Sequence, residues 1–221
     1  MFERIREDIA AVKERDPAAR SSLEIFFLYP GVRAIRMHRR ANWCFRHNFK
    51  FLARCISQRA VKKTGIEIHP GATLGRRVFI DHGTGVVIGE TAVVGDDVTI
   101  YQGVTLGGTG KDTGKRHPPI GAGVMLGAGA KVLGPYTVGE HSRIASGAIV
   151  LEEVPPNCTA AGVPARIVRR NGTKPLDQVH IPDPVAEQLC RMDHRIRLLE
   201  KALGEVSPER LALCNQADEN K

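Results

Sequence analysis

The stretch "IEIHPGATLGRRVFIDHGTGVVIGETAVVGDDVTI", residues 66–100, repeats an aliphatic residue every six positions. The series runs through Ile68, Leu74 and Ile80 and, after one step of eight residues, through Ile88, Val94 and Ile100. A period of six fits neither an α-helix nor a simple alternating strand. It is the signature of a hexapeptide β-helix, in which each hexad forms one short strand and a turn.

The repeat runs on to Leu106, pauses for fourteen residues, and resumes as Ile120, Leu126, Val132, Val138, Ile144 and Val150. Small residues, often Gly, follow many of these aliphatics and suit the tight turns. We therefore predict a left-handed parallel β-helix over residues 66–170. Its loop, residues 107–119, has no aliphatic to bury and should leave the coil, and such loops often carry function.

Helical patterns flank the repeat. Residues 1–65 predict an N-terminal helical domain, in which Asp16-Pro17 ends the first helix and offers Asp16 as the N-cap of the next. Residues 171–221 predict a C-terminal tail with a heptad helix at 184–206. The apolar seam of that helix packs either on its own domain or on copies of itself. A triangular prism pairs naturally with three-fold assembly, so we expect a homotrimer.

Charge and composition narrow the class of protein. The formal net charge is +8, and residues 33–63 hold ten Lys or Arg and no Asp or Glu. No nucleic-acid motif accompanies this charge, which favours a solvated helical face or one that attracts a small anion. The N-terminus has no apolar signal core, no run approaches a membrane span, and the five cysteines form no CxxC pair. We expect a cytoplasmic protein without disulfides.

Two histidines sit at the two breaks of the repeat, His82 beside the eight-residue step and His117 in the loop. An imidazole can take a proton from a hydroxyl and return it, which suits His82 as a general base. Glu67, fifteen residues earlier, is a candidate to orient it. Arg116 and His117 could hold a substrate carboxylate. A zinc site is not expected, because no third ligand is evident and Arg116 adds positive charge.

Several motifs together resemble serine O-acetyltransferase: "DHGTGVVIGET" (81–91), "TLGGTGK" (105–111), "RHP" (116–118), "GAGAKVLG" (127–134) and "AAGVPARIV" (160–168). The resemblance covers residues 1 to about 170. It implies acetyl transfer from acetyl-CoA to the hydroxyl of L-serine, the first step of cysteine biosynthesis. Acetyl-CoA would be a co-substrate, with no permanently bound cofactor and no metal.

Carried over by position, the resemblance implies that His82 is the general base and that Glu67 is its partner, where the family usually has Asp. Asp16 and Asp81 would lie near the serine ammonium, and Arg116 and His117 would bind its carboxylate. The coenzyme groove would involve five further residues: Gly108, Thr109, Ala128, Arg143 and Ser146.

The resemblance also implies partners. L-Cysteine would be a feedback inhibitor, and the protein would be a homotrimer or a dimer of trimers. Family members that bind cysteine synthase usually end in Ile, so Lys221 argues against that complex. No nucleic-acid or membrane partner is expected. Two alternatives stay open: a hexapeptide acetyltransferase acting on a sugar or xenobiotic hydroxyl, and a non-enzymatic β-helical binding module that uses residues 33–63.

Overall fold

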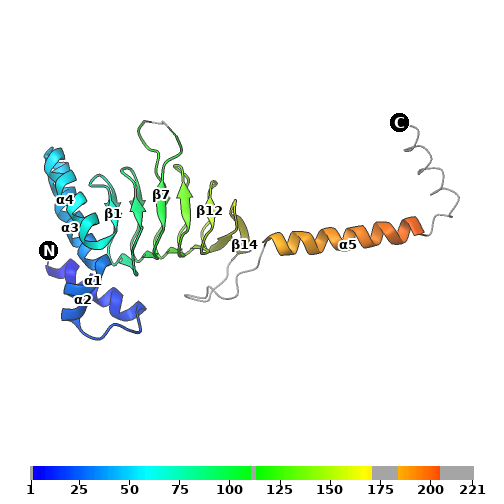
Figure 1. Ribbon diagram of the computed structural model, residues 1–221, viewed down its shortest axis with the longest axis horizontal. Coiled ribbons are helices and arrows are strands. Elements are labelled where there is room, and N and C mark those ends of the chain that lie inside the picture. The colour runs from blue at the N-terminus through cyan, green and yellow to red at the C-terminus, as the bar shows by residue number, and fades with distance from the viewer. Residues whose placement is uncertain (1, 111–112, 171–183, 205–221) are drawn as a thin grey trace. The chain divides into compact units, whose positions relative to one another are not determined.

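The computed structural model describes residues 2–110, 113–170 and 184–204 (Figure 1). It falls into two compact units, Met1–Pro182 and Asp183–Lys221, which we describe separately. In the first unit four helices precede a coil of short strands. The helices are α1 (Phe2–Arg15), α2 (Ser22–Leu28), α3 (Pro30–Arg46) and α4 (Lys50–Thr64).

The strands of the coil are β1 (Glu67–Ile68), β2 (Thr73–Leu74), β3 (Phe79–Ile80), β4 (Val87–Ile88), β5 (Val93–Val94), β6 (Thr99–Ile100), β7 (Thr105–Gly107), β8 (Pro119–Ile120), β9 (Met125–Leu126), β10 (Lys131–Leu133), β11 (Arg143–Ile144), β12 (Ile149–Val150), β13 (Cys158–Ala161) and β14 (Arg166–Arg170). Strands from successive coils stack in parallel into three sheets, in the orders β1-β4-β7-β10-β12, β2-β5-β8 and β3-β6-β9-β11-β13. Strand β14 closes the third sheet by pairing antiparallel with β13.

The pairing register places the hexad aliphatics on top of one another. Ile80 pairs with Ile100, and Ile100 with Leu126. These side chains are almost fully buried inside the coil, as are their counterparts in the other two sheets apart from Leu74, which is partly buried. The predicted hexapeptide-repeat coil of parallel strands is therefore confirmed, and its interior is a column of aliphatic side chains.

The N-terminal helices lie against the first coil. Ala34 and Ile35 of α3 belong to the same buried cluster as the coil interior. A Cβ atom added at Gly31 would stand 2.1 Å from the backbone oxygen of Ile80, so α3 begins in direct contact with β3. Arg15 at the end of α1 donates to Asp97 at 2.6 Å, which ties the helices to the second coil as well.

The helix boundaries largely follow the predicted signals. Helix α1 ends at Arg15, before Asp16-Pro17, and α4 ends at Thr64, where the C-cap Gly65 has a left-handed φ of 70°. The predicted N-cap was wrong: α2 is capped by Ser21, which accepts from the Glu24 N–H. The Asp16 Oδ1 instead accepts from the Ala18 N–H at 2.8 Å, because α2 starts six residues later in the chain.

The second unit contains the helix α5 (Pro184–Gly204), where the sequence predicted a heptad helix. Positions 205 and 206 of that prediction lie outside the described residues. The seam residues Leu189, Met192, Ile196 and Leu199 are each at least half exposed. No helix in the described part of the chain is long and apolar enough to cross a membrane.

Candidate active site

The turn between β3 and β4 is two residues longer than its counterparts. It spans residues 81–86, whereas the corresponding turns of the next two coils span 101–104 and 127–130. The backbone bonds locate the insertion. The Asp81 N–H donates to the Ile100 oxygen, just as the Tyr101 N–H donates to the Leu126 oxygen one coil later, so Asp81 and Tyr101 occupy equivalent positions. The two turns match again from Thr84 onward, where the Thr84 oxygen accepts from the Gly103 N–H. The two extra residues are therefore His82 and Gly83.

The inserted pair adopts a left-handed backbone, with φ of 55° at His82 and 79° at Gly83. A Cβ atom at position 83 would lie 2.4 Å from the Ile66 side chain, so only glycine fits there. The Asp81 Oδ1 accepts from the His82 N–H at 2.9 Å and holds the turn. The His82 side chain is 73% exposed. The insertion thus presents an accessible imidazole on a rigid coil.

Two carboxylates and two tyrosines gather beside this turn. The Tyr29 hydroxyl donates to Asp16 Oδ2 at 2.6 Å. Burial, followed by this hydrogen bond and the nearby charges, raises the pKa of Tyr29 to about 12. Burial and then the charges of Asp81 and Asp16 also raise the pKa of Tyr101. Asp16, which lies between α1 and α2, and Asp81 therefore form one negative patch next to His82.

Glu67 lies at the base of the same turn. Its N–H donates to the Val86 oxygen at 2.8 Å, at the point where the turn enters β4. No hydrogen bond joins Glu67 to His82 among the residues that the structure describes. The carboxylate that approaches the imidazole is Asp81, whose Oδ2 lies 3.9 Å from His82 Nε2. In the single chain Glu67 is therefore a neighbour of the turn rather than a direct partner of the imidazole.

The loop between β7 and β8 leaves the coil, as predicted (Figure 1). Its returning arm is bound to the turn after β4. Arg116 donates to Glu90 Oε2 at 2.7 Å, and the Lys115 ammonium donates to the Thr91 oxygen at 2.6 Å. The Thr91 hydroxyl accepts from the N–H groups of Arg116 and His117, both at 3.1 Å. Thr91 therefore fixes the backbone at both predicted carboxylate-binding residues.

The His117 ring is buried against this anchor. Its Nδ1 accepts from the Thr91 N–H at 3.2 Å, which leaves Nε2 as the hydrogen-bearing nitrogen of the neutral ring. The ring packs closely against Gly89, where an added Cβ would stand 2.1 Å from Nε2. Burial first, and then the charge of Arg116, lowers the pKa of His117. A neutral His117 can donate one hydrogen bond from Nε2 to an anionic group.

The two halves of the predicted site do not meet within one chain. The His82 turn enters the N-terminal end of β4, and Arg116 and His117 bind the turn that follows its C-terminal end. A single copy places the two groups at opposite ends of strand β4.

The predicted coenzyme residues divide in the same way. Ala128 and Ser146 occupy the position of Thr84 in later coils, because the Gly147 N–H donates to Ala128 just as the Gly103 N–H donates to Thr84. They therefore line the corner that carries His82. Gly108 and Thr109 lie in the loop, and Arg143 lies on β11. In the part of the chain that the structure describes, no three His, Cys, Asp or Glu side chains gather as a metal site would require.

Four residues of this arrangement were not predicted from the sequence: Tyr29, Glu90, Thr91 and Tyr101. Glu90 and Thr91 stand within the quoted motif "DHGTGVVIGET", so their position was visible but their role as loop anchors was not. Tyr29 directly precedes Pro30 at the start of α3, where a boundary residue looks ordinary.

Comparisons with known proteins point to one family. The family described as "Serine acetyltransferase, N-terminal" matches residues 1–37. A serine acetyltransferase of Bacillus subtilis is 51% identical over 205 residues, covering 91% of this chain and 94% of its own. A crystal structure of serine acetyltransferase from Brucella abortus in complex with coenzyme A aligns with a TM-score of 0.76 at 48% identity, covering 78% of this chain and 69% of that one.

A serine acetyltransferase in complex with cysteine aligns with a TM-score of 0.75 at 44% identity, over 76% of this chain and 66% of that one. The Bacillus subtilis relative matches at about half identity over 94% of its own length. The chain therefore belongs to the serine acetyltransferase family.

Proposed function

We propose that the protein transfers the acetyl group of acetyl-CoA to the hydroxyl of L-serine, which yields O-acetyl-L-serine and CoA in cysteine biosynthesis. The observation that carries the proposal is the two-residue insertion that holds an exposed His82 beside two carboxylates. Family membership supplies the reaction. An exposed imidazole on a rigid turn supplies a base for it.

In the proposed mechanism His82 removes the proton from the serine hydroxyl as the oxygen attacks the thioester carbon. The tetrahedral intermediate then collapses, the carbon–sulfur bond breaks, and the imidazolium returns its proton to the CoA thiolate. A base that acts in this way contributes roughly 10²–10⁴-fold to the rate. Glu67 at the base of the turn, and Asp81 at 3.9 Å, would stabilise the imidazolium.

The charges on the two sides of the site suit an amino acid. Asp16 and Asp81 form a negative patch for the ammonium, and Arg116 with a neutral His117 offers donors for the carboxylate. Because the two groups lie at opposite ends of strand β4, a complete site needs the His82 corner of one copy and the loop of another. This geometry supports a homotrimer in which neighbouring coils share each site, and dimers of such trimers would leave the sites intact.

We further propose that the coil is left-handed and that the coenzyme lies along its corner. Ala128 and Ser146 are small residues in line with the His82 turn, and Gly108, Thr109 and Arg143 would complete the groove. Within the chain we keep the predicted division into helices 1–65, coil 66–170 and tail 171–221. The exposed seam of α5 supports self-association of the tails. The cytoplasmic location stays a prediction.

L-Cysteine would inhibit by competing with serine, since it shares the ammonium and carboxylate and differs only in the sulfur. The thiol would lie against His82, and a nearby imidazolium stabilises a thiolate. Initial rates at several serine and cysteine concentrations test this inhibition. An apparent KM for serine that does not change with cysteine would exclude a shared site.

The activity itself is tested by measuring thiol release from acetyl-CoA with L-serine, and with a panel of sugars as acceptors. We expect release with serine that depends on His82. Release with sugars but not with serine would overturn the proposal.

A further inference from the structure

The helices α3 and α4 carry no acidic residue. From Ile25 to Ile66 the chain contains neither Asp nor Glu, although it holds the densest run of Lys and Arg in the sequence. The acetyl-transfer site described above uses none of these cations. Their arrangement in space therefore needs its own explanation.

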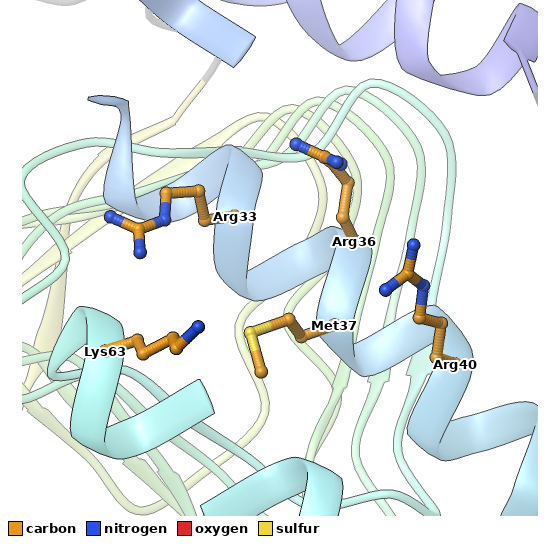
Figure 2. Close-up of a pocket in the computed structure, with 5 residues that line it drawn as sticks. All are labelled: Arg33, Arg36, Met37, Arg40 and Lys63. Carbon is orange, nitrogen blue, oxygen red and sulfur yellow. The ribbon is translucent and has the colours of Figure 1, made fainter. Parts of the chain in front are cut away.

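Four of these cations line one small pocket. Arg33, Arg36 and Arg40 follow one another at steps of three and four residues, so they project from the same face of α3. Lys63 reaches the pocket from α4, and Figure 2 shows Met37 between the two helices. The pocket volume is about 140 Å³. Clefts for drug-sized ligands are larger, at roughly 300–1,000 Å³.

Elsewhere in the first unit, several arginines pair with carboxylates. Arg39 pairs with Asp8 at 2.5 Å, Arg15 pairs with Asp97 at 2.6 Å, and Arg76 and Arg77 bind carboxylates of α1. Among the described residues, by contrast, none of the four cations of the pocket has a carboxylate partner. Burial first, and then the charges of Arg40 and Arg33, lowers the pKa of Arg36. These positive charges face one another without a counter-charge.

One of the arginines is held in place. Arg36 Nη1 donates to the Phe26 oxygen at 3.0 Å, and its guanidinium carbon lies 3.6 Å above the centre of the Phe26 ring. These contacts use one of the five N–H donors of the guanidinium. The remaining donors are fixed in direction, and a fixed guanidinium binds a planar or tetrahedral oxyanion with little loss of entropy.

We propose that this pocket between α3 and α4 binds a small tetrahedral oxyanion of the phosphate class, either as a free ion or as the terminal group of a small phosphomonoester. The site lies beside the turn that carries His82, since α3 begins against Ile80 and Gly65, after α4, lies next to Thr84. Arginine forks match the oxygens of such anions, and Lys63 adds a point charge. A polymer such as DNA would need an extended stripe of charge rather than one compact pocket.

The test is isothermal titration calorimetry on the full chain with inorganic phosphate, at constant ionic strength maintained with sodium chloride. We expect saturable binding of one phosphate per chain. Arg33→Gln and Lys63→Gln should each weaken binding about tenfold, since each removes a charge-assisted hydrogen bond. Lys62→Gln is the matched control: it removes the same charge from the neighbouring exposed position, which does not line the pocket, and should leave binding unchanged.

A second series uses glycerol 3-phosphate in place of inorganic phosphate. Tighter binding of the ester would identify a phosphomonoester group as the natural ligand, and equal or weaker binding would identify the free ion; both support the site. An absence of saturable heat with both probes, or equal weakening by Lys62→Gln and Lys63→Gln, would overturn the proposal. Salt-dependent DNA binding that phosphate does not displace would overturn it too. The readout does not involve acetyl transfer, so it is independent of the proposed function.

Discussion

Thr91 offers the sharpest test of how the loop serves the site. The residue lies on the coil, 25 and 26 positions before the two residues that it binds. Its hydroxyl accepts from the N–H groups of Arg116 and His117 and lies 2.9 Å from His117 Nδ1. The change Thr91→Val keeps the shape of the side chain and removes all of these contacts.

The free-energy cost of Thr91→Val follows from the burial of the Arg116 and His117 N–H donors. His117 is buried, so its N–H would lose its acceptor without access to water, which costs about 1–3 kcal/mol. Arg116 is half-buried, and water can partly replace the lost acceptor, so its share is about 1 kcal/mol. A total of about 2–4 kcal/mol lowers the equilibrium constant for loop ordering by roughly 30-fold to 700-fold.

The ion pair between Arg116 and Glu90 would retain part of the order. We therefore expect the KM for serine to rise at least about tenfold in Thr91→Val, with a much smaller change in kcat, because the proposed carboxylate-binding residues lie on the loop and the proposed base is unaltered. The assay is steady-state thiol release at saturating acetyl-CoA. The coil interior does not include Thr91, so the melting temperature should move by only a few degrees.

Thr91→Ser keeps the hydroxyl and is the control. It should retain a KM for serine close to that of the unmodified protein. The reasoning fails if Thr91→Val leaves that KM within about twofold of the original. It also fails if Thr91→Ser is impaired as strongly as Thr91→Val, because the methyl group and not the hydroxyl would then matter.

Four further outcomes are expected. His82→Ala should lower kcat by roughly 10²–10⁴-fold without loss of fold, by thiol release and circular dichroism, and near-normal turnover would remove the base assignment. Arg116→Ala should raise the KM for serine far more than that for acetyl-CoA; an equal rise would indicate a general loop-ordering role. Burial lowers the pKa of His38 to about 4, so between about pH 6.5 and 4 the unfolded chain binds a proton at His38 that the native state does not bind. Stability should therefore fall as pH decreases from about 6.5 to 4, by up to roughly 3 kcal/mol, and His38→Met should reduce this dependence in denaturant titrations at each pH. Truncation before Val185 should weaken the assembly in light scattering at low concentration, and an unchanged mass would show that the coils alone hold the copies together.

The fold could be predicted from the sequence because every coil repeats the same local rule. Ile68, Leu74 and Ile80 each point inward for the same steric reason, and one count of the period therefore places the strands from β1 to β12. The position of the insertion was also readable, since a step of eight in a period of six marks it. The anchors of the loop could not be predicted. Thr91, which binds the returning arm of the loop, lies one coil earlier, and its contact with the loop depends on how the coils stack.

The same limit applies to the helices. Asp16 was expected beside the substrate from family resemblance, but nothing in the sequence indicated that Tyr29 would hold its carboxylate. That contact depends on the packing of α3 against Ile80, which brings the residue before Pro30 to the His82 corner. Long-range packing of this kind has no periodic signature in the sequence.

In the proposed mechanism, this packing gives the N-terminal helices a part in binding the substrate as well as in covering the coil. Asp16 lies in the link between α1 and α2, and Tyr29 lies between α2 and α3. Both residues reach the His82 corner only because α3 seats on β3 through Gly31, where a side chain would collide with the Ile80 oxygen. A larger residue at position 31 would have to move α3, and with it the carboxylate of Asp16. A coil without its helices would keep His82 and Asp81 but lose half of the negative patch, so the proposed grip on the serine ammonium requires both parts of the first unit.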